Sequence, residues 1–569
     1  MKILLFGLNS SYTHTALALH SLHKSIENYE PLIIEHTING HYHDFLSDIF
    51  LAAPDVLCFS CYIWNIEIIE TLLRDVKKVL PGVIIICGGP EVSYDCVEFL
   101  DRNPAVNYCI AGEAEEAFKD VVDILSGISI LMPTNVAYRN QSDIISNRSV
   151  GLIKDLDKLK FPYDREFIEN NKNKIFYYET SRGCPYSCSY CMSSVEKAYR
   201  KKSLDKVFSE IEIFNQLGVR LVKLTDRTFN ADKKRALQIL EHISDMKTET
   251  LFHLEIAADL LNEDLIDVLN RMPKGRIQIE AGIQTTNPET TEAICRNISF
   301  ERSAENLKNV IKKGNVHVHT DLIAGLPYED LKSFERSFND VYNIGGHHLQ
   351  LGFLKLLKGT KIKGEYDQNN SCYTEKPPYE ILKTPWMSYE DLLVLKNTET
   401  AVERFSNSSN FTFVLEYIFL QKLFTPFLLF SFLGSYLKDR GYLSRPLSAY
   451  ECFDVFAHFI QGLSEVDDEH KNVILILLKM DLACSFPYRK LPSQFKDRLN
   501  YTLVKKEQEN EFLKTYTPDP LSLKILNEQR LNLSSLSLFN EIPDDAPVRY
   551  LEIDYARKSM TGRYSCRLL

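Results

Sequence analysis

The chain has 569 residues, a formal net charge of -11, and an ordinary composition with 44% hydrophobic and 25% charged residues. Its length favours three or four domains, and its composition excludes a disordered chain. Lysine and arginine form no dense block, which counts against a dedicated nucleic-acid binder. We therefore expect folded structure nearly from end to end and no nucleic-acid partner.

Three features favour a cytoplasmic protein. The N-terminus MKILLFGLNSS becomes polar by Asn9 and lacks the long apolar region of a signal peptide. Thirteen cysteines without a repeating spacing indicate reduced thiols rather than a disulfide framework. The apolar stretch 411–433 is interrupted by charged residues and a proline, so we expect a buried helical hairpin there and no membrane span.

Apolar runs alternate with helical stretches up to about residue 125. This pattern predicts an α/β fold, a doubly wound, Rossmann-like domain over residues 1–135 whose five-stranded parallel sheet is covered on both faces. Ligands of such domains bind beyond the carboxyl ends of the strands. The candidate residues in those loops are Asn9, Ser10, Ser60, Trp64, Asn65, Gly88, Gly89, Gly112 and Glu113. The two adjacent glycines also fit a plain turn between strand and helix.

A polar connector is expected over residues 136–169, followed by a second α/β series over residues 170–375. Six apolar segments there read as strands separated by helices, which favours a partial (β/α)6 barrel with its chemistry at the carboxyl-end loops. The six segments are KIFYYETSRG, VRLVKLTD, LFHLEIAAD, RIQIEAGIQ, VHVHTDLIAGLP and HHLQLGFLKLL. Residues 376–569 predict a mainly helical domain that ends in a strand or strand pair and carries no catalytic motif.

Three cysteines gather in one loop after the first of these strands. Cys184, Cys188 and Cys191 form a C-x3-C-x2-C pattern. A structural zinc site needs four ligands, and no second C-x2-C pair stands in a suitable loop. A disulfide between two of these cysteines is disfavoured because the thiols of a cytoplasmic protein stay reduced. Three thiolates on a compact loop suit an iron–sulfur cluster in which one iron lacks a protein ligand.

The pattern, with Tyr190 directly before the last cysteine, resembles the signature of the radical S-adenosylmethionine (SAM) superfamily. Downstream segments are similar as well: DLIAGLP resembles a fifth-strand motif that packs on adenine, and EAGIQTTNPET resembles a fourth-strand segment near the ribose and methionine. The resemblance implies these SAM contacts: Tyr190, Asp226, Glu280, Gln284, Arg296, Ile323, Gly325 and Pro327. Arg296 would face the carboxylate of SAM. The segment LTDRTFN departs from the family pattern, since only Asp226 there can bind the amino group.

The resemblance implies a [4Fe-4S] cluster that binds SAM through its open iron. One electron from this cluster would cleave SAM to methionine and a 5′-deoxyadenosyl radical. A closed barrel would protect this radical from water and oxygen.

The N-terminal domain resembles the cobalamin-binding domain of one class of these enzymes, in its segments GGPEVS and AGEAEEAF and in the strap DLDKLKFPYD. This class also carries a C-terminal domain of unknown function. The resemblance implies cobalamin as a cofactor and makes the loop residues given above its contacts. The Asp-x-His-x-x-Gly motif is absent around His14, so cobalamin either binds without a histidine ligand or the domain has lost it. We interpret His14 as a helix-start residue that faces solvent.

Several other polar residues have simpler explanations. His317, His319 and Asp321 alternate along one strand and are expected to line the barrel interior. Glu179 fits a structural ion pair better than a lining role. Glu113 fits the start of a helix, where the dipole favours an acid.

The leading hypothesis is a radical SAM enzyme that transfers a methyl group to an unactivated carbon or phosphorus of an unknown small-molecule or peptide substrate. It would need a low-potential electron donor such as flavodoxin or ferredoxin. The first alternative is a rearrangement, ring contraction or oxidation without methylation. The second is a non-catalytic cobalamin or redox sensor, against which the intact cysteine loop argues. A methylthiotransferase fits less well, because a second three-cysteine loop and a basic C-terminal module are missing.

Overall fold

The computed structural model describes residues 1–141, 143–195, 198–486, 502–504, 513–529, 533, 536–539, 547–549 and 551–569. These residues form two compact units. One unit comprises Met1–Ala281, Glu289–Asn306 and Phe353–Pro385, and the other Gly282–Pro288, Leu307–Gly352 and Trp386–Leu569. The predicted Rossmann-like domain and the predicted cysteine loop both lie in the first unit.

The N-terminal sheet has seven strands in the order β2-β1-β3-β4-β5-β6-β7. Its five parallel strands are β1 (Ile3–Asn9), β2 (Leu32–Thr37), β3 (Val56–Ser60), β4 (Ile84–Gly88) and β5 (Tyr108–Ile110). In the centre of the sheet Leu5 pairs with Ile33 on one side and with Cys58 on the other. The predicted five-stranded parallel sheet is confirmed.

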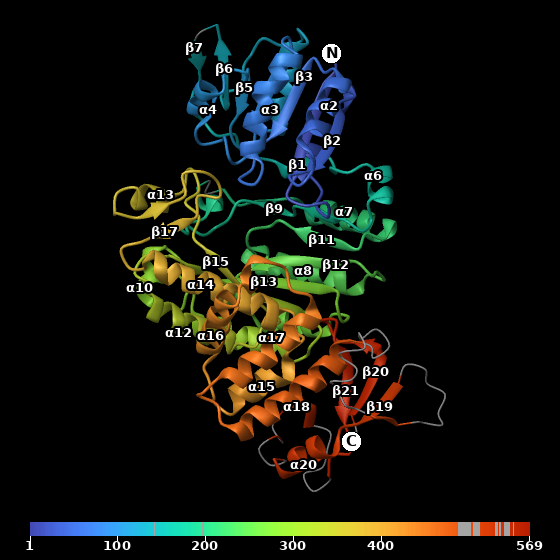
Figure 1. Ribbon diagram of the computed structural model, residues 1–569. Helices are drawn as coiled ribbons and strands as arrows, with labels where there is room; N and C mark the ends of the chain where they lie inside the picture. Colours follow the sequence, from blue (N-terminus) through green and yellow to red (C-terminus); the bar gives the residue numbers. More distant parts are fainter. Residues whose placement is uncertain are drawn as a thin grey trace. The chain divides into compact units, whose positions relative to one another are not determined.

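Helices cover both faces of this sheet (Figure 1). Successive residues of a strand point to opposite faces, so Leu4 and Phe6 join one apolar cluster while Ile3 and Leu5 join the other. The first cluster includes α2 (Tyr42–Ala52), α3 (Ile66–Val79) and α4 (Cys96–Arg102), and the second includes α1 (Leu17–Ser25) and α5 (Glu115–Leu125). This arrangement confirms the doubly wound fold.

The structure differs from the expectation in the segment after α5. We expected irregular chain there, but β6 (Val136–Asn140) pairs antiparallel with β5, and β7 (Asp143–Ile145) pairs antiparallel with β6. Both strands are short, and only the first two residues of β6 are buried. Edge strands of this kind carry little apolar signal, which explains why the sequence pattern did not indicate them.

The second sheet has six strands in the order β15-β14-β13-β12-β11-β8. They are β8 (Ile175–Tyr178), β11 (Leu221–Leu224), β12 (Leu251–Ile256), β13 (Ile277–Gln284), β14 (His317–Ala324) and β15 (His348–Phe353). All six predicted strands are confirmed. Helices stand between them: α7 (Leu204–Leu217), α8 (Lys233–Asp245), α9 (Glu263–Arg271), α10 (Pro288–Ala293), α11 (Phe300–Ile311) and α12 (Leu331–Tyr342).

The strands of this sheet have one apolar and one polar face. Along β13, Ile277, Ile279 and Ala281 are buried, whereas Gln278 and Glu280 between them are half-buried. The same alternation runs through β14. A strand with polar, partly accessible residues at every second position offers that face to ligands.

The C-terminal part is mainly helical, as predicted. It contains α14 (Tyr389–Ala401), α15 (Thr412–Leu420), α16 (Pro426–Asp439), α17 (Ala449–Gly462) and α18 (Asp468–Ser485). Residues 411–433 form α15 and the first part of α16, most of whose apolar residues are buried, but α15 packs mainly on α18 and α16 mainly on α14, so the two helices do not form the predicted hairpin. Among the helices that the structure describes, none has the length and apolar character required to cross a bilayer.

A four-stranded antiparallel sheet follows these helices. Its strands are β18 (Thr502–Val504), β19 (Leu513–Thr517), β20 (Leu551–Lys558) and β21 (Tyr564–Leu568). The predicted C-terminal strand corresponds to β20. Asp481 of α18 accepts hydrogen bonds from the amides of Phe413 and Val414 and forms a buried ion pair with Arg563 at 2.6 Å.

Candidate active site

The three-cysteine loop is closed at its base by a two-residue strand pair. Strand β9 (Ser181–Arg182) follows β8 and pairs with β10 (Arg200–Lys201), so that Arg182 stands opposite Arg200. The loop opens with Gly183, which has a φ of 85°. A Cβ atom at this position would overlap the Ala198 carbonyl, so only glycine fits.

The three cysteines of the loop differ in exposure. Cys188 is buried, whereas Cys184 and Cys191 are partly exposed, and the Cys184 sulfur lies 3.4 Å from the Thr228 hydroxyl. Burial raises the pKa of the Cys188 thiol, and the charge and hydrogen bond of Arg296 partly oppose that rise. Within the described part of the chain, no three histidine, cysteine or acidic side chains converge as they would on one metal ion. Cysteines that each bind a different iron of a cluster need not converge in this way.

Arg296, a predicted SAM contact, lies beside the cysteine loop. Its guanidinium Nη1 donates hydrogen bonds to the Cys188 sulfur at 3.5 Å and to the Tyr190 hydroxyl at 3.1 Å. The backbone holds the two segments together, because the Ser189 amide donates to the Ile294 carbonyl at 2.9 Å. The structure therefore brings together Cys188, Tyr190 and Arg296, three residues selected from two distant segments of the sequence.

Asp226 follows β11 and is buried beside the start of the same loop. Its Oδ2 atom accepts a hydrogen bond from the Thr180 amide at 2.9 Å. Its Oδ1 atom accepts from the hydroxyls of Thr180 and Ser181 at 2.6 and 2.5 Å. Burial raises the pKa of Asp226, and these hydrogen bonds oppose that rise. Both oxygens thus hold the chain just before the cysteine loop.

Glu280 lies at the centre of a charged group on the polar face of the sheet. Its Oε2 atom accepts hydrogen bonds from His253 at 2.9 Å and from Lys223 at 3.2 Å. The hydrogen bond from His253, together with Lys223, lowers the pKa of Glu280 to about 2. Lys223 also lies 3.7 Å from Glu255. Sequence reasoning selected Glu280 alone, because a lysine and a histidine within strands gave no signal of their own.

The remaining predicted SAM residues lie in the second unit, at the ends of β13 and β14. Gln284 has a φ of 74°, and its buried Oε1 has no hydrogen-bond partner among the described residues. Ile323 is half-buried on β14, Gly325 has a φ of 90°, and Pro327 is buried. Glu329, which sequence reasoning missed, is fully buried two residues after the proline, and burial raises its pKa to about 7.

The predicted lining histidines lie on the half-buried face of β14. Nε2 of His319 and Nδ1 of His317 are 2.9 Å apart. The ring of His317 stacks on His347, and that of His319 stacks on His348. Asp321 continues the same half-buried alternation.

At the carboxyl edge of the N-terminal sheet, two of the predicted residues tie strand ends together. The Asn65 side chain donates to the carbonyls of Leu8 and Ser60 at 3.1 and 3.0 Å. Asn9 donates to Glu35 at 2.6 Å. Ser60 is buried and Ser10 half-buried. These side chains shape the edge of the sheet.

Trp64 is an exposed aromatic residue of this edge. Its indole donates to the Leu8 carbonyl at 3.1 Å, and its ring stacks on Tyr62 with a centroid separation of 4.3 Å. Its exposed fraction is 43%. One face of the indole ring is thus held by the protein, while the residue keeps accessible apolar surface.

Two of the three predicted glycines of this edge are required by the backbone conformation. Gly89 has a φ of 109°, and a Cβ there would lie 2.6 Å from the Cys61 carbonyl oxygen. Gly112 has a φ of 79°, and its Cβ would lie 2.6 Å from the Gly151 carbonyl oxygen. A Cβ added at Gly88 would lie no closer than 3.6 Å to any atom beyond its chain neighbours, so a side chain would fit there.

Glu113 faces the cysteine loop rather than open solvent. It forms an ion pair with Arg200 at 2.6 Å and lies 3.5 Å from Arg182. Arg182 also pairs with Glu115 at 2.5 Å and with Glu179 at 2.8 Å. We call these five residues the clamp. It joins the N-terminal domain to both strands at the base of the cysteine loop, and it confirms the ion-pair interpretation of Glu179.

Arg182, Arg200 and Glu115 were missed as functional candidates. Isolated charged residues give no signal in a sequence, because their partners are set by tertiary structure.

His14 does not face solvent, contrary to our interpretation. Its Nδ1 is hydrogen-bonded to the Tyr177 hydroxyl, and the rings stack at a centroid distance of 5.9 Å. The Ile175 amide also donates to the Thr13 carbonyl at 2.7 Å. Burial lowers the pKa of His14, with a smaller contribution from the charge of Lys223. The first loop of the N-terminal sheet is therefore joined to the first strand of the second sheet.

Comparison with known proteins found three family models that match separate parts of the chain. The family model of the B12 binding domain matches residues 4–122, and that of the radical SAM superfamily matches residues 178–341. Residues 367–539 match a family described as a protein of unknown function, DUF4080.

Two curated relatives match about half of the chain. The 2-(S-pantetheinyl)-carbapenam-3-carboxylate methyltransferase of Streptantibioticus cattleyicolor is 27% identical over 52% of this chain and 46% of its own length. The cobalamin-dependent radical SAM methyltransferase TokK of Streptomyces tokunonensis is 26% identical over 54% of this chain and 49% of its own length. The chain thus spans about half the length of these relatives.

Among solved structures, the fold is similar to that of OxsB, described as a cobalamin-dependent S-adenosylmethionine radical enzyme. The TM-score is 0.58 with 13% identity, over 88% of this chain and 83% of that one. At such low identity, the similarity is evidence for the fold alone. Together, the family matches show that the chain carries a radical SAM domain over residues 178–341, preceded by a B12 binding domain over residues 4–122 and followed by a DUF4080 region over residues 367–539.

Proposed function

We propose that the protein is a cobalamin-dependent radical SAM methyltransferase whose [4Fe-4S] cluster is held by Cys184, Cys188 and Cys191. The observation that carries this proposal is the position of the cysteine loop. The loop follows the first strand of the barrel sheet, Arg296 lies beside Cys188, and the clamp fastens the base of the loop to the B12-binding domain.

The residues present fit SAM. Arg296 is a cation beside the cysteines and suits the carboxylate of SAM. Tyr190 is the aromatic neighbour proposed for adenine. Gln284, with its unpaired Oε1, supplies an acceptor for a ribose hydroxyl, and Ile323, Gly325 and Pro327 supply the apolar wall for the base.

The charged residues have separate roles in this proposal. Glu280, held ionised by His253 and Lys223, binds the ribose and methionine side of SAM. Asp226 acts as a positioning residue, because both of its oxygens already bind Thr180 and Ser181.

The residues present also fit cobalamin without a histidine ligand. The His14 ring is already engaged by Tyr177, which leaves it poorly placed to bind cobalt. The exposed surface of Trp64 suits the edge of a flat macrocycle. Ser10, Ser60 and the backbone at Gly88 and Gly89 border the same edge of the sheet. Asn9, Asn65, Gly112 and Glu113 shape that edge through their own contacts.

When bound, the cluster supplies the electron that cleaves SAM, and cobalamin carries the methyl group to be transferred. The chain positions SAM through Arg296 and fixes the cysteine loop against the B12-binding domain through Arg182 and Arg200. The polar face formed by Tyr177, Lys223 and His253 is the proposed substrate side. A small molecule or peptide binds there, and a flavodoxin or ferredoxin supplies the electrons.

Anaerobic reconstitution with iron and sulfide tests the central claim. The protein is expected to become brown, to bind about four irons per chain, and to release 5′-deoxyadenosine from SAM under dithionite. The variant with all three cluster cysteines changed to alanine is expected to lose both properties. Cys295→Ala is the matched control, because Cys295 is also partly exposed near this site but lies outside the motif. Equal iron and equal product in both variants would exclude the proposed ligands.

Methyl transfer is tested separately from SAM cleavage. Protein reconstituted with cob(I)alamin and SAM carrying a labelled methyl group is expected to yield labelled methylcobalamin and S-adenosylhomocysteine. Cleavage to 5′-deoxyadenosine without labelled methylcobalamin would instead favour radical chemistry without methylation.

A further inference from the structure

Two cysteines of the N-terminal domain lie in direct contact away from the cluster loop. The sulfur of Cys96, at the start of α4, is 2.9 Å from that of Cys109 on β5. Both thiols point at the Val92 carbonyl, at 3.1 Å from Cys96 and 3.9 Å from Cys109. Cys109 is fully buried, whereas Cys96 retains 9% of its surface.

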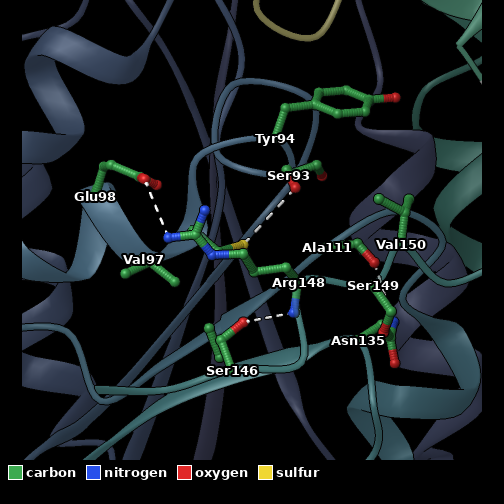
Figure 2. Close-up of a pocket in the computed structure, with 12 residues that line it drawn as sticks. Ser93, Tyr94, Val97, Glu98, Ala111, Asn135, Ser146, Arg148, Ser149 and Val150 are labelled. Atoms are coloured by element: carbon green, nitrogen blue, oxygen red, sulfur yellow. Dashed lines mark hydrogen bonds and ion pairs between the residues drawn. The ribbon is translucent and has the colours of Figure 1, made fainter. Parts of the chain in front are cut away.

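Cys96 also lines a pocket of about 160 Å³. The pocket is bordered by the loop after β4, which supplies Ser93 and Tyr94, and by the loop after β7, which supplies Arg148. Figure 2 shows Arg148 extended toward Glu98, and these two side chains are 3.7 Å apart and largely exposed. Because the lining includes exposed side chains, the pocket gives a small molecule access from solvent to one of the two thiols. Its volume is several times that of one water molecule, about 30 Å³.

We propose that Cys96 and Cys109 form a reversible dithiol site that reacts with low-molecular-weight disulfides entering this pocket. In the first step, the Cys96 thiolate attacks a disulfide R–S–S–R, forms a mixed disulfide and releases one thiolate RS⁻. In the second, Cys109 attacks the Cys96 sulfur, and its proton passes to the departing RS⁻, which leaves as RSH. The two cysteines are thereby oxidised to one disulfide, and R–S–S–R is reduced to two thiols.

The order of the two steps follows from accessibility. Cys109 has no exposed surface, so an external disulfide reaches only Cys96. The hydrogen bond with Cys96 and burial hold the pKa of the Cys109 thiol well above its usual range. Cys109 is therefore the resolving residue. It reacts because its sulfur already lies against that of Cys96, and not because its thiol is acidic.

Oxidation acts on the loop that follows β4. It removes the hydrogen bond from Cys96 to Val92 and draws α4 toward β5. The same loop begins at Gly89, whose carbonyl accepts hydrogen bonds from the amides of Val92 and Ser93. This last step rests on the proposed function: if Gly88 and Gly89 border cobalamin, the oxidised protein retains less cobalamin than the reduced protein.

The test uses the full chain, purified reduced and without oxygen, then exposed to oxidised glutathione. After alkylation and digestion, mass spectrometry is expected to show loss of both free thiols and a linked Cys96–Cys109 peptide that dithiothreitol removes. Cys109→Ser is expected to stop at the glutathione adduct of Cys96. Cys61 and Cys87 are the internal control, because their thiols also touch but both are fully buried and neither lines the pocket.

Two results would overturn the proposal. One is that Cys96 and Cys109 keep free thiols in the folded wild type; the other is that Cys61 and Cys87 link equally well. Near-ultraviolet circular dichroism establishes that Cys109→Ser is folded, and wild-type data stand without that variant. Cobalamin retention is measured on the same oxidised and reduced samples. If the Cys96–Cys109 disulfide forms but cobalamin retention does not change, only the effect on cobalamin is refuted. The experiment therefore distinguishes failure of the dithiol site from failure of the proposed cofactor.

Discussion

Removal of Arg182 tests whether the clamp holds the base of the cysteine loop. Its guanidinium contacts Glu115 at 2.5 Å, Glu179 at 2.8 Å and Glu113 at 3.5 Å, and 12% of its side chain is exposed. Arg182→Ala leaves these carboxylates without their shared partner. Removing one member of a buried ion pair costs about 3–5 kcal/mol, and we expect about 3 kcal/mol because Arg200 still pairs with Glu113.

Urea unfolding of the apoprotein measures this loss. The chain has two tryptophans, Trp64 in the first unit and Trp386 in the second. In a Trp386→Phe background, fluorescence therefore reports on the unit that contains the clamp. Reconstituted iron per chain provides a second readout, which is expected to fall because Arg182 lies two residues before Cys184.

Arg165→Ala is the matched control. Arg165 pairs with Glu169 at 3.0 Å, but its side chain is 73% exposed. Exposed pairs contribute about 0–1 kcal/mol. If Arg182→Ala costs no more than this control and binds normal amounts of iron, the clamp does not position the loop. A double-mutant cycle with Glu115→Gln isolates the coupling of the closest pair.

Three further predictions concern single residues. Gly89→Ala is expected to cost about 1–3 kcal/mol in urea unfolding, because its φ is 109° and its Cβ would meet the Cys61 carbonyl; Gly82→Ala, where nothing lies within 4 Å, is the control, and equal effects would contradict the argument. Arg296→Ala is expected to weaken SAM binding about tenfold to a hundredfold, through loss of a charged hydrogen-bond donor; equilibrium dialysis of the reconstituted protein checks this, and an unchanged Kd would remove Arg296 from the SAM site. Glu329 has a pKa raised from 4.5 to about 7, so the folded protein binds more protons than the unfolded chain between these values, and stability falls as the pH rises through them. Glu329→Gln is expected to remove that fall, on the order of 3 kcal/mol, which is seen as a higher Tm at pH 8 and little change at pH 4; parallel pH profiles for variant and wild type would refute it.

The sequence was sufficient to predict both sheets because their strands are marked by apolar runs. The alternation along β13 also separated the polar from the buried face. In contrast, β6 and β7 were missed because short edge strands bury few residues. A buried strand is marked by its own apolar residues. A short edge strand is stabilised mainly by pairing with the neighbouring strand, which the local sequence does not show.

The sequence identified residues of the site but not most of the contacts between them. The motif and resemblance led to Tyr190 and Arg296, which the structure places within 3.1 Å of each other. The clamp could not be predicted, because Glu113 and Arg200 are distant in sequence and each alone fits a solvated surface. The same limit led us to expect His14 in solvent, although it contacts Tyr177.

The backbone link between Thr13 and Ile175 makes one amide a reporter of domain motion. The Ile175 amide donates to the loop after β1 instead of to a neighbouring strand of its own sheet. Its exchange with deuterium requires the N-terminal domain to move away from β8. Amides within β1 or β8 exchange only when a sheet itself opens. Comparison of these exchange rates distinguishes movement of the N-terminal domain from unfolding of a sheet. The exchange rate of the Ile175 amide then measures how often the domain with the proposed cobalamin loops separates from β8.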